Sequence, residues 1–284
     1  MKNNGIIENA KIAIVSDIHG NYQALKAVID DIERKNINYI ICLGDVIGKG
    51  INSRKCIDLI KTKCNIVLRG NVDDRFCMNP NNFKDADNEY NRIKFYQRFL
   101  TDDDIKYLSN LPLCTEFYLS GNLIRLFHAS PNNPYQTIEN YEMDFTKKYK
   151  LFEPTENTTD RVADIVIFGH LHYQFLEKFY GKTLINCGSV GCSGCPILKD
   201  GYNSNHEISN AHYLILSGNL NDKENDNIEF HLESILYDKE TEIIDSQNLN
   251  NIDPGYDNLL RNAYYPGLSN IMKNISEKGY KLFK

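Results

Sequence analysis

The chain has 284 residues, of which 42% are hydrophobic and 25% charged, enough to bury a large core as one large domain or two smaller ones. Its net charge of −6 argues against tight binding to long nucleic acid and repels phosphate at long range. A phosphate site would therefore need local positive charge, which a bound metal can supply.

The N-terminal stretch 1–11 has no apolar core, and the apolar runs are no longer than a strand. We therefore expect neither a secretory signal nor a membrane span. The eight cysteines are scattered, which favours reduced thiols in the cytoplasm. A zinc site at Cys192 and Cys195, with Cys187 nearby, is a weaker interpretation, because a single CxxC lacks a second pair.

Short β-rich runs alternate with helical patterns in the first part of the chain. Residues 22–34 carry an apolar stripe of helical period, and a second helix is expected over 56–63. This order predicts an α/β core that begins with parallel strands, and the strand-rich later part predicts a second sheet. The expected strands are residues 11–17, 39–45, 65–70, 123–128, 163–170, 184–190, 212–217 and 228–237, the last of them more exposed because apolar and polar residues alternate along it.

A charged and aromatic insertion over 73–110 separates two of these strands, and a helix is expected near 89–100. We interpret this insertion as a lid over one end of the sheets. Residues 238–284 are expected to form C-terminal helices interrupted at Pro266-Gly267. No flexible linker divides the chain, so a single domain over 1–284 is predicted.

Polar residues follow five of the predicted strands directly, where open α/β sheets place their ligand sites. Each short pattern alone is an ordinary turn or surface loop, but the ordered set at successive strand ends indicates a metal centre. Mixed carboxylate, amide and imidazole ligands suit Mn or Fe, with Zn as a further option. The candidate ligands are Asp17, His19, Asp45, Asn71, His128, His170 and His172.

In this ordered set the chain resembles the calcineurin-like metallophosphoesterases, over residues 11–191. The family pattern is Asp-x-His, Gly-Asp, Gly-Asn-x-Asp, a lone His and Gly-His-x-His. The resemblance implies a four-layer α-β-β-α sandwich with two divalent or trivalent metal ions and catalytic roles for Asp45, Asn71 and His128. It implies a bridging Asp45 shared between two ligand sets, one completed by Asp17, His19 and His172 and the other by Asn71, His128 and His170.

The segment 186–191 is similar to the Asn-Pro-Gly-Ser-Val-Gly of small bacterial phosphodiesterases and diadenosine tetraphosphatases, with Cys187 where proline is usual. A second departure is Val72, which stands where many members have a histidine that assists the leaving group. Asp73 matches the residue that orients this histidine. The departure favours substrates with good leaving groups, which need a proton donor least.

These features predict a metal-dependent hydrolase that uses a metal-bound hydroxide on a small phosphodiester or phosphoanhydride, such as a dinucleoside polyphosphate. The expected partner is a small phosphorylated molecule, with no long nucleic acid and no membrane; the oligomeric state stays open. Alternatives are a phosphoprotein phosphatase, which usually has Asp-Arg where this chain has Gly48-Lys49, a nuclease, or a non-catalytic scaffold on the same fold.

Overall fold

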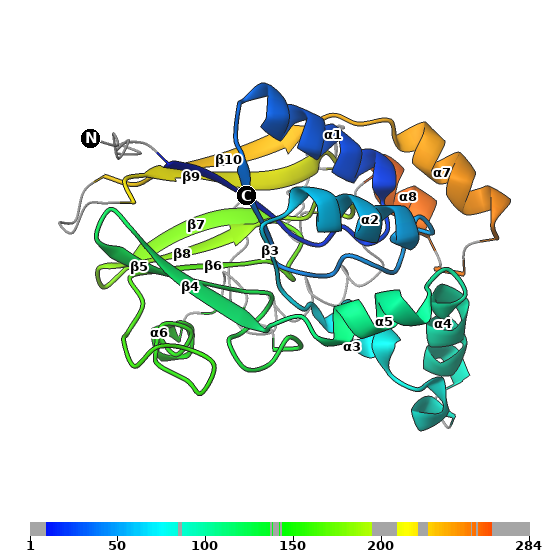
Figure 1. Cartoon of the computed structure of the whole chain (residues 1–284), viewed down its shortest axis with the longest axis horizontal. Coiled ribbons are helices and arrows are strands. Elements are labelled where there is room, and N and C mark those ends of the chain that lie inside the picture. The colour runs from blue at the N-terminus through cyan, green and yellow to red at the C-terminus, as the bar shows by residue number, and fades with distance from the viewer. Residues whose placement is uncertain are drawn as a thin grey trace, which may run out of the picture.

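Two five-stranded sheets face each other, with helices on their outer sides, in the computed structural model of the chain (Figure 1). The structure describes residues 10–84, 87–136, 138, 142, 144–194, 209–220, 227–250, 252–253 and 255–262. This arrangement confirms the predicted α/β sandwich.

The first sheet has the strand order β10-β9-β1-β2-β3. Strands β1, β2 and β3 are parallel, and helices α1 (Tyr22–Arg34) and α2 (Ser53–Lys63) join them, as predicted. Edge strand β10 alternates between exposed and half-buried residues, which also agrees with its sequence pattern. The strands are β1 (Ala10–Val15), β2 (Tyr39–Cys42), β3 (Ile66–Val67), β9 (Ala211–Gly218) and β10 (Glu229–Ile235).

Successive residues of β1 point to opposite sides of this sheet, so a continuously apolar strand serves two cores. Ala13 and Val15 pack against the helices, whereas Ile12 and Ile14 pack against the second sheet. The strand therefore lies buried on both faces, which leaves its carboxyl end as the place where a polar side chain can emerge.

The second sheet has the order β4-β5-β6-β8-β7, with β5, β6 and β8 parallel. Its outer face packs Phe127 and Phe168 against Phe152 and the short helix α6 (Phe145–Tyr149). The edge strands β4 and β7 were not among the predicted runs. The strands are β4 (Cys114–Leu119), β5 (Asn122–Phe127), β6 (Ile165–Phe168), β7 (Gln174–Phe179) and β8 (Lys182–Cys187).

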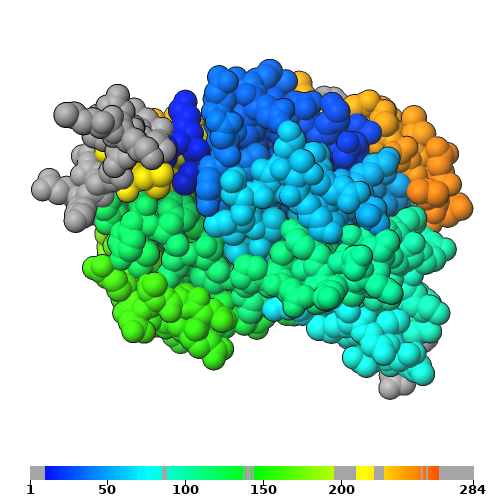
Figure 2. Space-filling model, viewed as in Figure 1, coloured from blue at the N-terminus to red at the C-terminus, as the bar shows by residue number. Residues whose placement is uncertain are grey.

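The insertion forms helices beside the carboxyl ends of the parallel strands and projects from the body of the molecule (Figures 1 and 2). The helix expected near 89–100 is α4, and Tyr96 on it donates a hydrogen bond to the carbonyl of Lys49 at 2.8 Å. The helices are α3 (Asn71–Cys77), the 3-10 turn η1 (Pro80–Phe83), α4 (Asp87–Gln97) and α5 (Asp102–Ser109).

Two helices of the predicted C-terminal extension are present, α7 (Lys239–Asn248) and α8 (Tyr256–Asn262). Ile243 and Tyr256 on them pack around the side chain of Cys192. The expected break at Pro266-Gly267 lies outside the described residues. Within the part of the chain that the structure describes, no helix has the length and apolar character needed to cross a membrane.

Candidate metal centre

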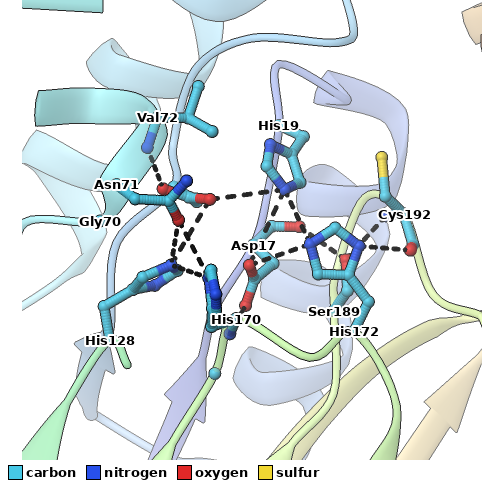
Figure 3. Close-up of polar contacts among 12 residues, drawn as sticks. Asp17, His19, Gly70, Asn71, Val72, His128, His170, His172, Ser189 and Cys192 are labelled. Carbon is cyan, nitrogen blue, oxygen red and sulfur yellow. Dashed lines mark hydrogen bonds and ion pairs between the residues drawn. The ribbon is translucent and has the colours of Figure 1, made fainter. Parts of the chain in front are cut away.

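All seven candidate ligands converge at the carboxyl ends of the strands, in the space between the two sheets (Figure 3). The loops after β1, β2 and β3 of the first sheet and after β5 and β6 of the second supply them. Residues more than 150 positions apart in the chain thus face one another, as the strand-end pattern predicted; His19 and His172 are one such pair.

A first donor set consists of Asp17, His19 and His172. The Nε2 atoms of the two imidazoles lie 3.0 Å apart, and Nε2 of His172 lies 3.2 Å from Oδ1 of Asp17. The distance between Nε2 of His19 and the same Oδ1 is 3.7 Å. Ligand atoms bound to one ion at about 2.0–2.2 Å are roughly 3–3.6 Å apart, so this spacing fits a shared cation.

A second donor set consists of Asn71, His128 and His170. Oδ1 of Asn71 lies 2.9 Å from Nε2 of His128 and 3.0 Å from Nδ1 of His170. The two imidazole nitrogens are 3.3 Å from each other. An amide oxygen and two ring nitrogens at these distances form a second set with the spacing of ligands around one ion.

The carboxylate of Asp45 lies between the two donor sets. Its Oδ2 is 3.6 Å from Nε2 of His19 and 3.5 Å from Nε2 of His128. Its Oδ1 points the other way and accepts a hydrogen bond from the backbone N–H of Val72 at 2.8 Å. One oxygen of Asp45 therefore faces both sets.

The donors have the character that a cation requires. Nδ1 of His172 faces the carbonyl of Cys192 at 3.0 Å, so this nitrogen carries the proton and Nε2 presents its lone pair. That lone pair points toward the buried Oδ1 of Asp17, which accepts no hydrogen bond from any described residue. Two lone pairs directed at each other need a positive charge between them, so the residues fit a metal ion.

Burial sets the charge of these groups. It lowers the pKa of His19 well below the usual value and that of His170 to about 3, so both imidazoles are neutral and able to coordinate. Burial, with Asp17 and Asp73 nearby, raises the pKa of Asp45 well above its usual range. A cation beside Asp45 would remove this penalty.

The backbone is strained at most of the candidate ligands. Asp17, His19, Asp45, His170 and His172 all have left-handed φ angles, between 51° and 67°. Such conformations cost about 1–3 kcal/mol each in non-glycine residues and persist where the surroundings enforce them. Their concentration here is independent of the ligand chemistry and marks the same site.

The segment 186–191 supports loops of both donor sets. The hydroxyl of Ser189 donates to the carbonyl of Asp17 at 2.7 Å and accepts from the N–H of Cys192 at 2.8 Å. The amide of Asn186 donates to the carbonyl of Gly169, beside His170. In the sequence this segment stands out only through a resemblance; in the structure it holds the loops that carry candidate ligands.

Position 72 differs from its expected role. The side chain of Val72 points away from the candidate ligands (Figure 3). It packs over Gly48 beside Phe76, so close that a Cβ on Gly48 would lie 2.7 Å from Val72 and 2.8 Å from Phe76. Asp73 orients no histidine and instead accepts hydrogen bonds from backbone N–H groups of the Asp45 loop. Residue 72 contacts the site through its backbone N–H, which donates a hydrogen bond to Oδ1 of Asp45.

The zinc interpretation of the cysteines gains no support from the described part. Burial raises the pKa of Cys192 to about 12 and that of Cys187 well above the usual value, which disfavours the thiolates that zinc requires. Cys195 lies outside the described residues. Of the remaining histidines, His231 is exposed on β10, and His206 also lies outside the described residues.

A family model of calcineurin-like phosphoesterases matches residues 10–174 of the chain. An uncharacterized protein of Methanocaldococcus jannaschii is 30% identical over 181 residues, which is 63% of this chain and 69% of that protein. The chain therefore belongs to the calcineurin-like phosphoesterase family, and it is a metallophosphoesterase, a hydrolase.

Solved structures show the same fold. A hypothetical protein of Pyrococcus horikoshii superposes with a TM-score of 0.68 at 17% identity, over 88% of this chain and 97% of its own. A metallophosphoesterase of Sphaerobacter thermophilus superposes with a TM-score of 0.66 at 19% identity, over 89% of this chain and 100% of its own. The four-layer sandwich is thus shared along nearly the whole length of both proteins.

Proposed function

We propose that this phosphoesterase holds two metal ions: each donor set would hold one, and Asp45 would be the ligand that the two sets share. The position of its Oδ2, 3.6 Å from His19 and 3.5 Å from His128, is the observation that carries the proposal. Two adjacent cations need an anion between them to offset their repulsion. Mn or Fe suits the mixed ligands best, with Zn as a further option.

Two bound ions would polarise a phosphoryl oxygen and lower the pKa of a bound water so that it can attack phosphorus. The protein's own part is to keep the imidazoles neutral and the ligands fixed. We propose that Lys49 adds positive charge for the phosphate, because its Nζ is buried on the loop that follows Asp45. After burial itself, its ammonium contributes most to lowering the pKa of His19 and His172.

We propose a small phosphodiester or phosphoanhydride as substrate, such as a dinucleoside polyphosphate, rather than long nucleic acid. The net charge of −6 disfavours a polyanion that extends beyond the site. No histidine stands at position 72, so a leaving group that departs as a stable anion suits the site. We place this activity in the cytoplasm, which agrees with seven free cysteines among the described residues.

The test combines metal content with hydrolysis of bis(p-nitrophenyl) phosphate by the full chain. We expect two ions per chain after loading with Mn²⁺, and activity that disappears with a chelator and returns with Mn²⁺. One ion per chain in the fully active enzyme would overturn the dinuclear proposal. Two ions without hydrolysis of this diester or of a dinucleoside polyphosphate would overturn the proposed substrate class.

A further inference from the structure

The carboxylate of Asp73 is fully buried and hydrogen-bonded to the backbone of the Asp45 loop. Its Oδ2 accepts the N–H of Asp45 at 2.7 Å and that of Gly70 at 3.1 Å. Its Oδ1 accepts the N–H of Val46 at 2.9 Å and, at 3.3 Å, that of Ile47. One side chain of the insertion thus holds three consecutive residues of the loop that carries the shared ligand.

This loop needs to be held because Asp45 has a left-handed φ of 53°. Such a conformation is costly for an aspartate and would relax without support. The chain approaches so closely here that a Cβ on Gly70 would lie 2.1 Å from Oδ1 of Asp45. Three neighbouring residues therefore act on Asp45. Gly70 leaves room for its Oδ1, the N–H of Val72 donates to that oxygen, and the carboxylate of Asp73 accepts from its backbone N–H.

We propose that Asp73 is a positioning residue, which locks the backbone of Asp45 so that Oδ2 faces both donor sets. This inference rests on the proposed dinuclear function. A carboxylate is needed because four N–H groups converge on its two oxygens. An asparagine has a single acceptor oxygen, and its NH₂ group would face backbone donors.

Asp104 provides a matched control. It occupies the same place in α5 that Asp73 occupies in α3, three residues after the N-cap, and it is also buried. Its Oδ2 accepts the N–H of Thr101 at 3.0 Å, just as Asp73 accepts that of Gly70. Its other contacts are to the hydroxyl of Thr101, to Arg54 and to Lys61, none of which is a candidate ligand.

The experiment compares the wild-type chain with Asp73→Asn and Asp104→Asn, each loaded with Mn²⁺. Metal stoichiometry is measured by equilibrium dialysis, and electron paramagnetic resonance detects the spin-coupled pair. We expect Asp73→Asn to lose the coupled signal and to bind Mn²⁺ about 10–100-fold more weakly, the usual loss when a group that orients a ligand is removed. Asp104→Asn should keep the coupled pair even where its melting temperature falls.

A coupled pair retained by folded Asp73→Asn overturns this inference and leaves the proposed function intact. A wild-type chain with no coupled pair overturns both. Where Asp73→Asn does not fold, hydrogen exchange of the wild-type chain decides. The amides of Asp45 and Val46 should already be protected without metal, and protection that appears only with Mn²⁺ would show that the metal positions the loop.

Discussion

The two donor sets are similar in chemistry but differ in how far the protein encloses them. Asp17, His19 and His172 are all buried, with His172 only 8% exposed. Asn71 and His170 of the second set are partly exposed to solvent. The first set is therefore enclosed by the fold, whereas in the second set solvent reaches Asn71 and His170 although His128 is buried.

The supporting contacts follow the same division. The first set is braced by Ser189 and by the carbonyl of Cys192, which fixes the ring of His172. In the second set, Asn71 is the first residue of α3, a helix of only seven residues that leads into the insertion. Its position therefore depends on a short helix rather than on the sheets. An ion at the first set should consequently be held more tightly, and one at the second should exchange more readily.

The largest effect is expected where the two sets meet. Asp45→Asn should remove the shared anion and lower activity by more than about 10³-fold, because each ion contributes several kcal/mol to the transition state. Steady-state hydrolysis of bis(p-nitrophenyl) phosphate, together with metal content, measures the effect. The control Asp30→Asn, on the exposed side of α1, should behave as wild type. Full activity of Asp45→Asn would remove the basis for treating the sets as one centre.

The sets should also separate in the order in which they lose metal. With excess chelator, Mn²⁺ should leave the wild-type chain in two phases, the faster from the second set. His170→Ala should abolish the fast phase, and His172→Ala should abolish the slow one. His231→Ala, exposed on β10, should retain both. If His172→Ala abolished the fast phase instead, the first donor set would be the one that releases its ion more readily.

The pH dependence of metal binding should reflect Asp45 rather than the histidines. Burial, together with Asp17 and Asp73, raises the pKa of Asp45, so below this raised pKa the metal-free site holds a proton that the metal must displace. Metal affinity should therefore fall about tenfold for each pH unit as pH drops, one proton being released. Burial lowers the pKa of His170 to about 3 and keeps His19 neutral too. The slope should therefore not steepen at about pH 6.5, where free imidazole would begin to compete. Calorimetry in buffers of different ionisation enthalpy counts the protons.

The strand ends and their candidate ligands could be placed together from the sequence because most of these residues closely follow a buried apolar strand. β1 ends at Val15 and Asp17 follows, and β6 ends at Phe168 and His170 follows. Parallel strands bring such ends together at one edge, so local patterns were sufficient. The edge strands β4 and β7 were missed because their mostly half-buried residues include polar ones and lack a long apolar run.

The supporting contacts could not be predicted, since they join segments far apart in the chain through backbone atoms. Ser189 meets Asp17 across 172 positions. The sequence predicted that Asp73 would match a residue that orients a histidine at position 72. In the structure, its four N–H contacts depend on how the loop after β2 lies against the start of α3. Backbone donors leave no signature in side-chain composition.

A smaller effect is expected when this support is weakened without touching a ligand. Ser189→Ala removes the hydrogen bonds to the carbonyl of Asp17 and from the N–H of Cys192. We expect about 10–100-fold weaker Mn²⁺ binding in the slow phase alone. The control is Ser109→Ala, whose hydroxyl donates to the carbonyl of Ile105 within α5, at 2.7 Å. Equal weakening of both phases would mean that Ser189 supports the whole centre.

The smallest effect is expected at position 72, where the sequence alone suggests that a histidine would restore a proton donor. In the structure, Val72 serves the centre through its N–H to Asp45, while its side chain points toward Gly48 and Phe76. The carboxylate of Asp73 already accepts hydrogen bonds from four N–H groups and has no free position from which to orient an imidazole.

Val72→His should therefore keep the wild-type preference for aryl esters and phosphoanhydrides over alkyl esters. Val72→Ala should keep it too, because both variants retain the N–H. The ratio of kcat/KM for p-nitrophenyl and alkyl phosphodiesters measures this preference. A positioned acid contributes about 10²–10⁴-fold where it is needed, so a histidine that reached the leaving group would raise the alkyl rate by an amount easily seen. Such a rise in Val72→His, absent from Val72→Ala, would show that the start of α3 can turn its side chain toward the second donor set.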